Sequence, residues 1–150
     1  MTSEVCSDRP VPALICLAFA RVTDEILGCL HDEGFDDLRL THFLQVFRHV
    51  SGTGDRPADI ARSAGVTPQA LAQTLLELES LGYVRRQPDR EDRRSQRIFW
   101  AARGLRAGQV LEEHYARMET RWGQAVGVDA VATSRALLSA ILDEAQGSGS

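Results

Sequence analysis

The most constraining feature of the sequence is the order of structural elements predicted within residues 59–104. A short helix ends at Gly65, because glycine readily adopts the left-handed conformation found at helix C-termini. Thr67 is a good N-cap for a longer second helix. Two strands then flank an arginine-rich loop of residues 88–95. This order is typical of proteins that lay one helix in a DNA groove with a basic wing beside it.

Amphipathic periodicity predicts further helices on both sides of this segment. The first runs from about residue 12 to residue 31. The second carries apolar residues in i, i+3, i+4, i+7 order: Leu40, Phe43, Leu44 and Phe47. A long helix after Gly104 has an apolar stripe, and a last helix begins near Asp129, which we expect to be its N-cap. The stripe consists of Leu111, Tyr115, Met118 and Trp122.

The predicted fold is mainly α with a small β-hairpin wing: a winged helix-turn-helix with N- and C-terminal dimerisation helices. We expect an N-terminal dimerisation helix in residues 1–36, a DNA-binding winged domain in 37–101, C-terminal dimerisation helices in 102–146, and a disordered tail in 147–150. The outer helices would have little to cover in a monomer, so we expect a homodimer. The alternative is a satellite core within one chain.

The charge distribution agrees with a local basic surface. The net charge is -4, but residues 82–106 contain eight arginines against Asp89, Glu91 and Asp92, a balance of +5. Local charge near the phosphates governs counterion release, whereas an acidic remainder mainly adds solubility. The overall charge therefore does not exclude a nucleic-acid partner.

Three motifs resemble those of the MarR family of bacterial winged-helix transcriptional regulators. They are Ile60–Val66 (IARSAGV), Leu78–Arg86 (LESLGYVRR) and Asp89–Arg94 (DREDRR). The resemblance implies an obligate homodimer held by its terminal helices that binds an inverted repeat in double-stranded DNA. It implies a transcriptional regulator, for which we favour repression over activation. Operator, regulated genes and effector identity are left open by the sequence.

The candidate DNA contacts lie on the second helix of the motif and on the wing. The polar side chains of that helix suit base edges, and its N-terminus suits a phosphate. Arginine fits a narrow minor groove, and the family's counterpart of Arg94 commonly makes that insertion, with Asp92 placed to orient the guanidinium. The predicted contacts are Thr67, Gln69, Ala70, Gln73, Thr74, Arg86, Arg90, Arg93 and Arg94. The alternative is a merely solvated polar helix and a solvated charged hairpin.

Two positions depart from the family pattern. The stretch 67–78 contains no basic residue, so DNA affinity should depend more on the wing and on Arg85 and Arg86. Ala101 replaces the threonine that usually caps the helix after the second strand. The loss of such a cap costs about 1 kcal/mol.

Regulation has several readings. A small aromatic or amphipathic effector would suit a crevice lined by Phe19, Phe43, Phe47 and the apolar stripe, although these residues could simply be core. Cys16 resembles the reactive position of hydroperoxide-sensing relatives, but their supporting tyrosines are absent, so a buried inert thiol is favoured. The spacing of His42, His49 and His114 is not that of a compact metal-ligand motif. We therefore expect no metal and no cofactor.

Other function classes find little support. No catalytic Ser/His/Asp or Cys/His set and no glycine-rich phosphate loop is present, so an enzyme is not expected. The longest apolar stretch, residues 11–20, is half a membrane span with no basic region before it, which favours a cytoplasmic protein without a membrane partner. The main alternative is a winged-helix protein-interaction module that does not bind DNA.

Overall fold

The computed structural model describes residues 8–147 of the chain. They belong to two compact units, the first ending at Leu111 and the second beginning at Glu112. The predicted disordered tail begins at Gly147, which is the last residue of the final helix; its other residues, 148–150, lie outside the described part.

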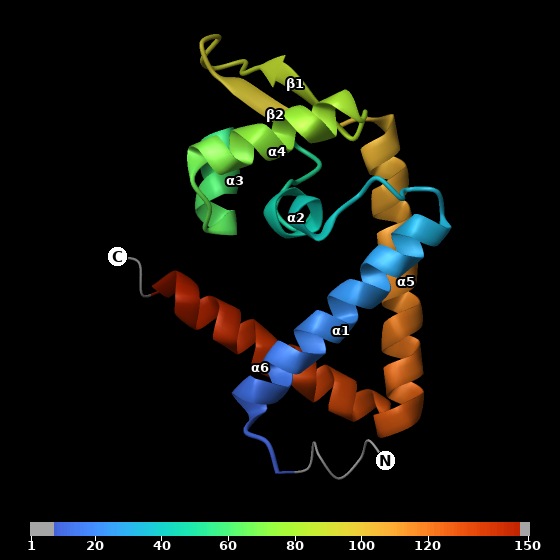
Figure 1. Cartoon of the computed structure of the whole chain (residues 1–150). Helices are drawn as coiled ribbons and strands as arrows, with labels where there is room; N and C mark the ends of the chain where they lie inside the picture. Colours follow the sequence, from blue (N-terminus) through green and yellow to red (C-terminus); the bar gives the residue numbers. More distant parts are fainter. Residues whose placement is uncertain (1–7, 148–150) are drawn as a thin grey trace. The chain divides into compact units, whose positions relative to one another are not determined.

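The described residues form six helical segments and one antiparallel hairpin (Figure 1). In chain order the elements are α1 (Val11–Asp32), α2 (Leu40–His42) with the π-helix η1 (Phe43–Phe47), α3 (Pro57–Ala64), α4 (Pro68–Ser80), β1 (Val84–Pro88), β2 (Gln96–Trp100), α5 (Ala102–Val126) and α6 (Val128–Gly147). The predicted mainly α fold with a small hairpin is confirmed.

The helix-turn-helix is bounded by the residues that the sequence indicated. Gly65 ends α3 with φ 67°. The Thr67 side-chain oxygen accepts a hydrogen bond from the Ala70 N–H at 3.2 Å and caps α4. At the other end of α4, Gly82 has φ 81°, and the Tyr83 N–H donates to the Leu78 carbonyl at 2.9 Å. This is a Schellman ending, in which the left-handed glycine turns the chain directly into β1.

Two expectations about helix starts are wrong. Helix α5 begins at Ala102 and includes Gly104, whereas we expected the glycine to precede it. A Cβ at Gly104 would lie 2.2 Å from the Tyr83 carbonyl oxygen. Glycine at this position therefore allows α5 to pack closely against the Tyr83 backbone. Helix α6 begins at Val128, which places Asp129 in its first turn instead of at the N-cap. The chain turns between these helices at Gly127, with φ 92°.

The second helix differs from its predicted α-helical form. It starts as the short α2 and widens into the π-helix η1 over Phe43–Phe47. Leu40 of α2 is exposed, while Phe43 and Val46 of η1 are buried. The predicted four-residue apolar face is therefore only partly buried.

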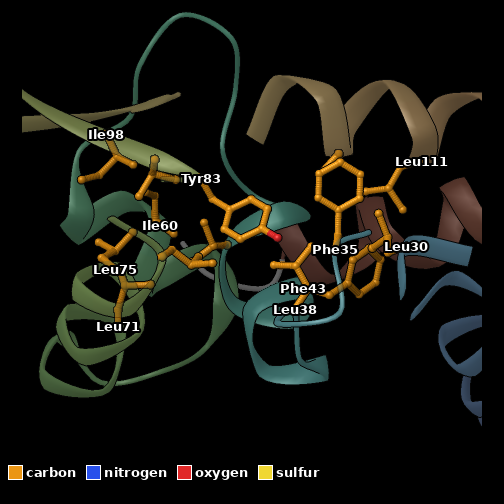
Figure 2. Packing of buried hydrophobic residues seen from close by; sticks show 14 of the residues in the cluster. Leu30, Phe35, Leu38, Phe43, Ile60, Leu71, Leu75, Tyr83, Ile98 and Leu111 are labelled. Carbon is orange, nitrogen blue, oxygen red and sulfur yellow. The ribbon is translucent and has the colours of Figure 1, made fainter. Parts of the chain in front are cut away.

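Tyr83 lies at the centre of the hydrophobic core of the first unit (Figure 2). Its ring centroid is 6.2 Å from that of Phe35 and 5.9 Å from that of Phe47. Its hydroxyl donates to Asp37 at 2.5 Å, and the same carboxylate accepts from Arg103 Nη1 at 2.6 Å. Burial and the hydrogen bond to Asp37 raise the pKa of Tyr83 well above its usual value. This cluster ties the start of the hairpin to α5 and to the segment before α2.

The second unit consists of the remainder of α5 and helix α6. Arg135 of α6 donates two hydrogen bonds to Glu119 of α5, at 2.7 and 2.9 Å. No single helix within residues 8–147 is both long and apolar enough to cross a membrane. Helices α5 and α6 reach that length and composition only together, and they are bent by 119° at their break.

Candidate nucleic-acid interface

The N-terminal half of α4 presents a neutral polar surface. Thr67, Gln69, Ala70 and Gln73 are all exposed, as predicted. Thr67 uses its oxygen lone pair for the cap, which leaves its hydroxyl hydrogen available to another acceptor. The remaining amides of the first turn point out of the helix end, where an anion is stabilised.

Thr74 does not lie on this surface, and the prediction that placed it there is wrong. Thr74 is 6% exposed, and its hydroxyl donates to Gln45 Oε1 of η1 at 2.7 Å. The physical reason is helical periodicity. The buried residues of α4 are Leu71, Thr74, Leu75 and Leu78, a complete i, i+3, i+4, i+7 face in which threonine replaces one apolar residue. A buried hydrogen-bonded hydroxyl is satisfied in that position.

Near the C-terminal end of α4, Glu77 is paired with residues of the α2 segment. Its carboxylate accepts from Arg39 and lies 3.2 Å from His42 Nε2. His42 is fully buried, and its Nδ1 accepts the backbone N–H of Arg39 at 3.2 Å. Because an amide N–H can only donate, Nδ1 is the acceptor in this bond, and Nε2 is the ring nitrogen that faces Glu77. The only acidic group within residues 67–78 is thus compensated.

The hairpin beside α4 has two chemically different faces. Val84 pairs with Trp100 and Arg86 with Ile98 on the face that contains the buried Val84 and Ile98. The register places Arg85 opposite Phe99, and Gln87 opposite Arg97, on the other face.

Arg86 lies on the inner face and is only partly available. Its Nε donates to Glu79 Oε2 of α4 at 3.1 Å. The two Nη groups have no hydrogen bond or ion pair within residues 8–147. The predicted contact residue therefore lies between α4 and the wing with only its Nε engaged.

The wing tip carries three exposed arginines, the predicted Arg90, Arg93 and Arg94. Within residues 8–147, none of their guanidinium groups has an ion-pair partner. A positive charge that is not neutralised by its own chain remains available to an external anion.

Asp92 orders the wing turn in a way that differs from the prediction. Its Oδ1 accepts the backbone N–H of Arg94 at 3.0 Å, and its Oδ2 accepts the Ser95 hydroxyl at 2.8 Å. The hydrogen bonds from Ser95 and from the Arg94 amide lower the pKa of Asp92. The carboxylate therefore holds the backbone from which Arg94 projects and does not hold the guanidinium itself.

Asp89 is the wing residue that the sequence reasoning missed. It is 1% exposed, and its Oδ2 accepts from Arg56 Nε at 2.9 Å and lies 3.0 Å from Arg97 Nε. Its Oδ1 accepts the Glu91 N–H at 3.0 Å. That backbone bond and the two guanidiniums, opposed by burial, lower the pKa of Asp89 to about 2. Asp89 thus anchors the base of the wing to the loop before α3.

The residues predicted for regulation are not brought together. Phe43 is buried in the core, and the Phe47 ring packs 4.8 Å from that of Trp100. Phe19 is exposed on α1 outside this cluster. The phenylalanines therefore form no common crevice. Cys16 is exposed, so the favoured reading of a buried thiol is wrong.

The histidines mainly bond to their own neighbourhood. His49 Nδ1 lies 2.8 Å from Ser63 Oγ, and its Nε2 lies 3.1 Å from the Leu44 carbonyl. Burial and the charge of Arg48 lower the pKa of His49. In the described part of the chain, no group of three or more His, Cys, Asp or Glu side chains is arranged to hold a metal ion.

Part of the chain matches a known family, and the fold is similar to that of solved structures. Residues 43–95 match the sequence model of the MarR family. A crystal structure of MarR superposes with a TM-score of 0.74 at 22% identity, covering 93% of this chain and 92% of that chain. FabT of Streptococcus pneumoniae, in complex with DNA, gives 0.73 at 17% identity, covering 91% and 96%.

A MepR mutant of S. aureus bound to an oligodeoxyribonucleotide gives a TM-score of 0.54 at 16% identity, covering 91% of this chain and 99% of that chain. Identities this low establish a common fold. No curated protein matches the chain. The predicted resemblance to MarR-family winged-helix regulators is confirmed.

Proposed function

We propose that this chain, with its MarR-family segment, is a homodimeric, sequence-specific DNA-binding transcriptional regulator. Helix α4 enters the major groove, and the arginine-rich wing contacts the adjacent minor groove. Repression is the favoured direction of control, because a dimer bound across a promoter blocks access to it.

The observation that carries the proposal is the wing tip. Arg90, Arg93 and Arg94 project from a turn that Asp92 orders, and Asp89 anchors the base of that turn to the loop before α3. A turn held at both ends presents charged side chains with little loss of conformational entropy on binding. The DNA in the FabT and MepR structures supports a nucleic-acid partner for this fold.

The neutral polar surface of α4 favours a role in base recognition, in contrast to the charged wing. Gln69 and Gln73 can each make bidentate hydrogen bonds to adenine, and Ala70 can contact a thymine methyl group. Without basic residues from Thr67 to Leu78, α4 gains little from phosphate attraction. We therefore assign sequence discrimination to α4 and most of the electrostatic affinity to the wing.

Homodimerisation is supported by exposed apolar residues on the outer helices, each considered within its own unit. Leu17 and Phe19 are exposed on α1 in the first unit. In the second unit the exposed apolar residues of α6 are Val128, Leu137, Leu138, Ile141 and Leu142. Large apolar side chains in such number are typical of surfaces covered by a partner. We propose that α1, α5 and α6 form the dimer interface.

A small aromatic or amphipathic effector remains part of the proposal, with a site other than the phenylalanine crevice. The second unit contains an apolar cavity of about 410 Å³ between α5 and α6. Trp122, Val126 and Leu138 contribute to its walls. Pockets of this size and character hold small organic ligands. Saturable quenching of tryptophan fluorescence by a ligand, lost in Val131→Arg, would support this site, because Val131 lines the cavity and is not among the exposed residues assigned to the dimer interface.

A second candidate is regulation through oxidation of Cys16, which its exposure favours. An accessible thiol can reach the sulfenic acid or disulfide stage when peroxide is present. Loss of DNA binding on peroxide treatment in the wild type, with retention in Cys16→Ser, would support this reading. Equal responses of the two proteins would contradict it.

The direct test is footprinting of the purified protein on the DNA upstream of its own gene. We expect protection of an inverted repeat whose two halves lie about one helical turn apart. A variant with Arg90, Arg93 and Arg94 all changed to glutamine should lose this protection while keeping its oligomeric state. An unchanged footprint would contradict the proposed role of the wing. If the wild type protects no site, the alternative of a protein-interaction module is favoured.

A further inference from the structure

The outer face of the hairpin, opposite to the face that contains Val84 and Ile98, forms a groove of about 610 Å³. Its walls come from β1, β2, the wing loop and the loop before α3. The residues that line it are Thr53, Arg85, Gln87, Pro88, Asp89, Arg90, Glu91, Arg97 and Phe99. The groove is distinct from the exposed surface of α4. Its lining includes the predicted contact residue Arg90 and also Arg85, which the sequence analysis expected to add to DNA affinity.

The floor of this groove is held in place by close packing. The ring of Phe99 lies against Gly54, where a Cβ atom would be 2.4 Å from the tip of the ring. Asp55 pairs with Ile98 through two backbone hydrogen bonds of 3.0 and 2.8 Å, which extend the hairpin by one residue of this loop. The Arg85 guanidinium carbon lies 5.0 Å from the Phe99 ring centroid. The groove therefore exists before any ligand arrives.

The groove is rich in hydrogen-bond donors. Arg85 stacks on Phe99 and has no hydrogen bond or ion pair within residues 8–147, so its five N–H groups are available. Arg97 engages Nε with Asp89 and Nη1 with the Gly54 carbonyl, which leaves Nη2. The amide of Gln87 lies opposite Arg97 in the register. Among the described residues, three different side chains thus supply free donors to one cavity.

The acidic residues of the groove are largely compensated. Asp89 is enclosed by Arg56 and Arg97 and by the Glu91 amide, so its oxygens are already occupied. Glu91 is well exposed at the rim, where its carboxylate lies 3.8 Å from Arg56. The ligand that fits free guanidinium and amide donors in a groove of this kind is a compact anion with several acceptor oxygens.

We propose that this groove binds a phosphate group through Arg85, Gln87 and Arg97. The phosphate belongs either to the DNA backbone beside the wing or to a free phosphorylated molecule. In the first case the inference rests on the proposed function, since the groove then gives the wing a second DNA contact. Arg90 lines the groove and also belongs to the wing tip, so the groove and the surface of the wing tip are continuous.

The test uses the whole protein with Arg85→Gln, which removes the charge and keeps most of the side-chain length. Arg21→Gln is the matched control, because Arg21 is an exposed arginine on α1 outside the wing. If the DNA backbone is the ligand, Arg85→Gln reduces the slope of log K against log salt by about 0.9 per subunit. Preference for the operator over scrambled DNA stays unchanged, and Arg21→Gln keeps the wild-type slope.

The second arm detects a free phosphorylated ligand and does not require DNA binding. Inorganic phosphate is titrated against chloride at equal ionic strength while the Nε–H resonances of Arg85, Arg97 and Arg21 are followed by NMR. A free-ligand site gives saturable shifts of Arg85 and Arg97, no saturable shift of Arg21, and an unchanged DNA salt slope in Arg85→Gln. The proposal is overturned if the two variants have equal slopes and phosphate shifts none of the groove resonances selectively. A protein that binds no DNA would contradict the proposed function, and the phosphate titration would still decide this inference.

Discussion

Helix α4 and the wing use their polar groups in opposite ways. In α4, Thr74 bonds to Gln45 and Glu77 is compensated by Arg39 and His42, so several polar side chains serve to position the helix. In the wing, buried and turn aspartates fix the backbone, while the tip arginines remain without partners within the described residues. In the proposed function, the helix provides sequence discrimination and the wing provides electrostatic attraction.

The difference shows how a protein with a net charge of -4 can present a site for a polyanion. Electrostatic attraction depends on charges near the phosphates, and distant acidic groups are screened within about 8 Å at physiological salt. The carboxylates close to the wing tip are engaged by backbone amides and guanidiniums. The free charge that remains there is positive.

The largest expected effect comes from removing the packing that places α4. Leu75 is fully buried, and Leu75→Ala should lower the free energy of unfolding by about 2–5 kcal/mol, because it leaves a cavity in the core. Leu76→Ala is the matched control, since that neighbour is 55% exposed. Denaturant unfolding followed by circular dichroism measures both. Equal losses in the two variants would contradict the assigned orientation of α4.

The second-largest effect tests whether the wing contributes electrostatic affinity for DNA or preference for the operator sequence. Arg94→Ala should weaken operator binding by about 1–3 kcal/mol and lower the salt dependence, with the dimer intact. The loss should apply to operator and to unrelated DNA alike if the contact is mainly to phosphates. Anisotropy titrations on both DNAs at several salt concentrations measure it. An unchanged affinity at fixed salt would favour the protein-interaction module.

A substitution in α4 should change base preference and leave the salt dependence of binding unchanged, which is the reverse of the effect expected for the wing. Gln73→Ala should reduce discrimination at one base pair of each half-site by about 1–3 kcal/mol and leave the salt slope unchanged. Binding to a panel of operators with single base-pair changes measures the effect. If Gln73→Ala altered the salt slope and left base preference intact, the division of roles between helix and wing would be wrong.

Acid should loosen the base of the wing through protonation of Asp89. The pKa of Asp89 is lowered from 3.8 to about 2, so its ionised form stabilises the folded wing above pH 3.8. That contribution is lost as the pH falls from 3.8 toward 2. The Glu91 amide and Arg97 Nε–H resonances of the folded protein should shift with a midpoint near pH 2 in NMR spectra. In Asp89→Asn the transition should be absent, and its persistence would point to a different group.

The smallest effect concerns the start of α5. Ala101 occupies the position before the first residue of the helix, Ala102, where a side-chain oxygen could cap a free amide. Ala101→Thr should raise the free energy of unfolding by about 0.5–1 kcal/mol. The control is Ala102→Thr, which adds the same side chain one residue inside the helix. A gain in thermal stability confined to Ala101→Thr would agree with this position as the N-cap.

Several site residues could be predicted because their signals are local. The exposure of Gln69, Gln73 and the tip arginines followed from their places in a helix and a turn. The burial of Thr74 was also available in the pattern, since it completes the spacing of Leu71, Leu75 and Leu78. The error arose from counting only apolar residues as members of the buried face.

The sequence alone determined the elements, because capping residues, left-handed glycines and apolar periodicity act within a few residues of one another. It placed Thr67 at the start of α4 and Gly82 at its end for that reason. Only the tertiary structure decided the contacts between distant segments: Asp89 with Arg56, Thr74 with Gln45, and Gly104 under the Tyr83 carbonyl. These contacts depend on how the segments pack in space, and no local preference specifies which residue meets which.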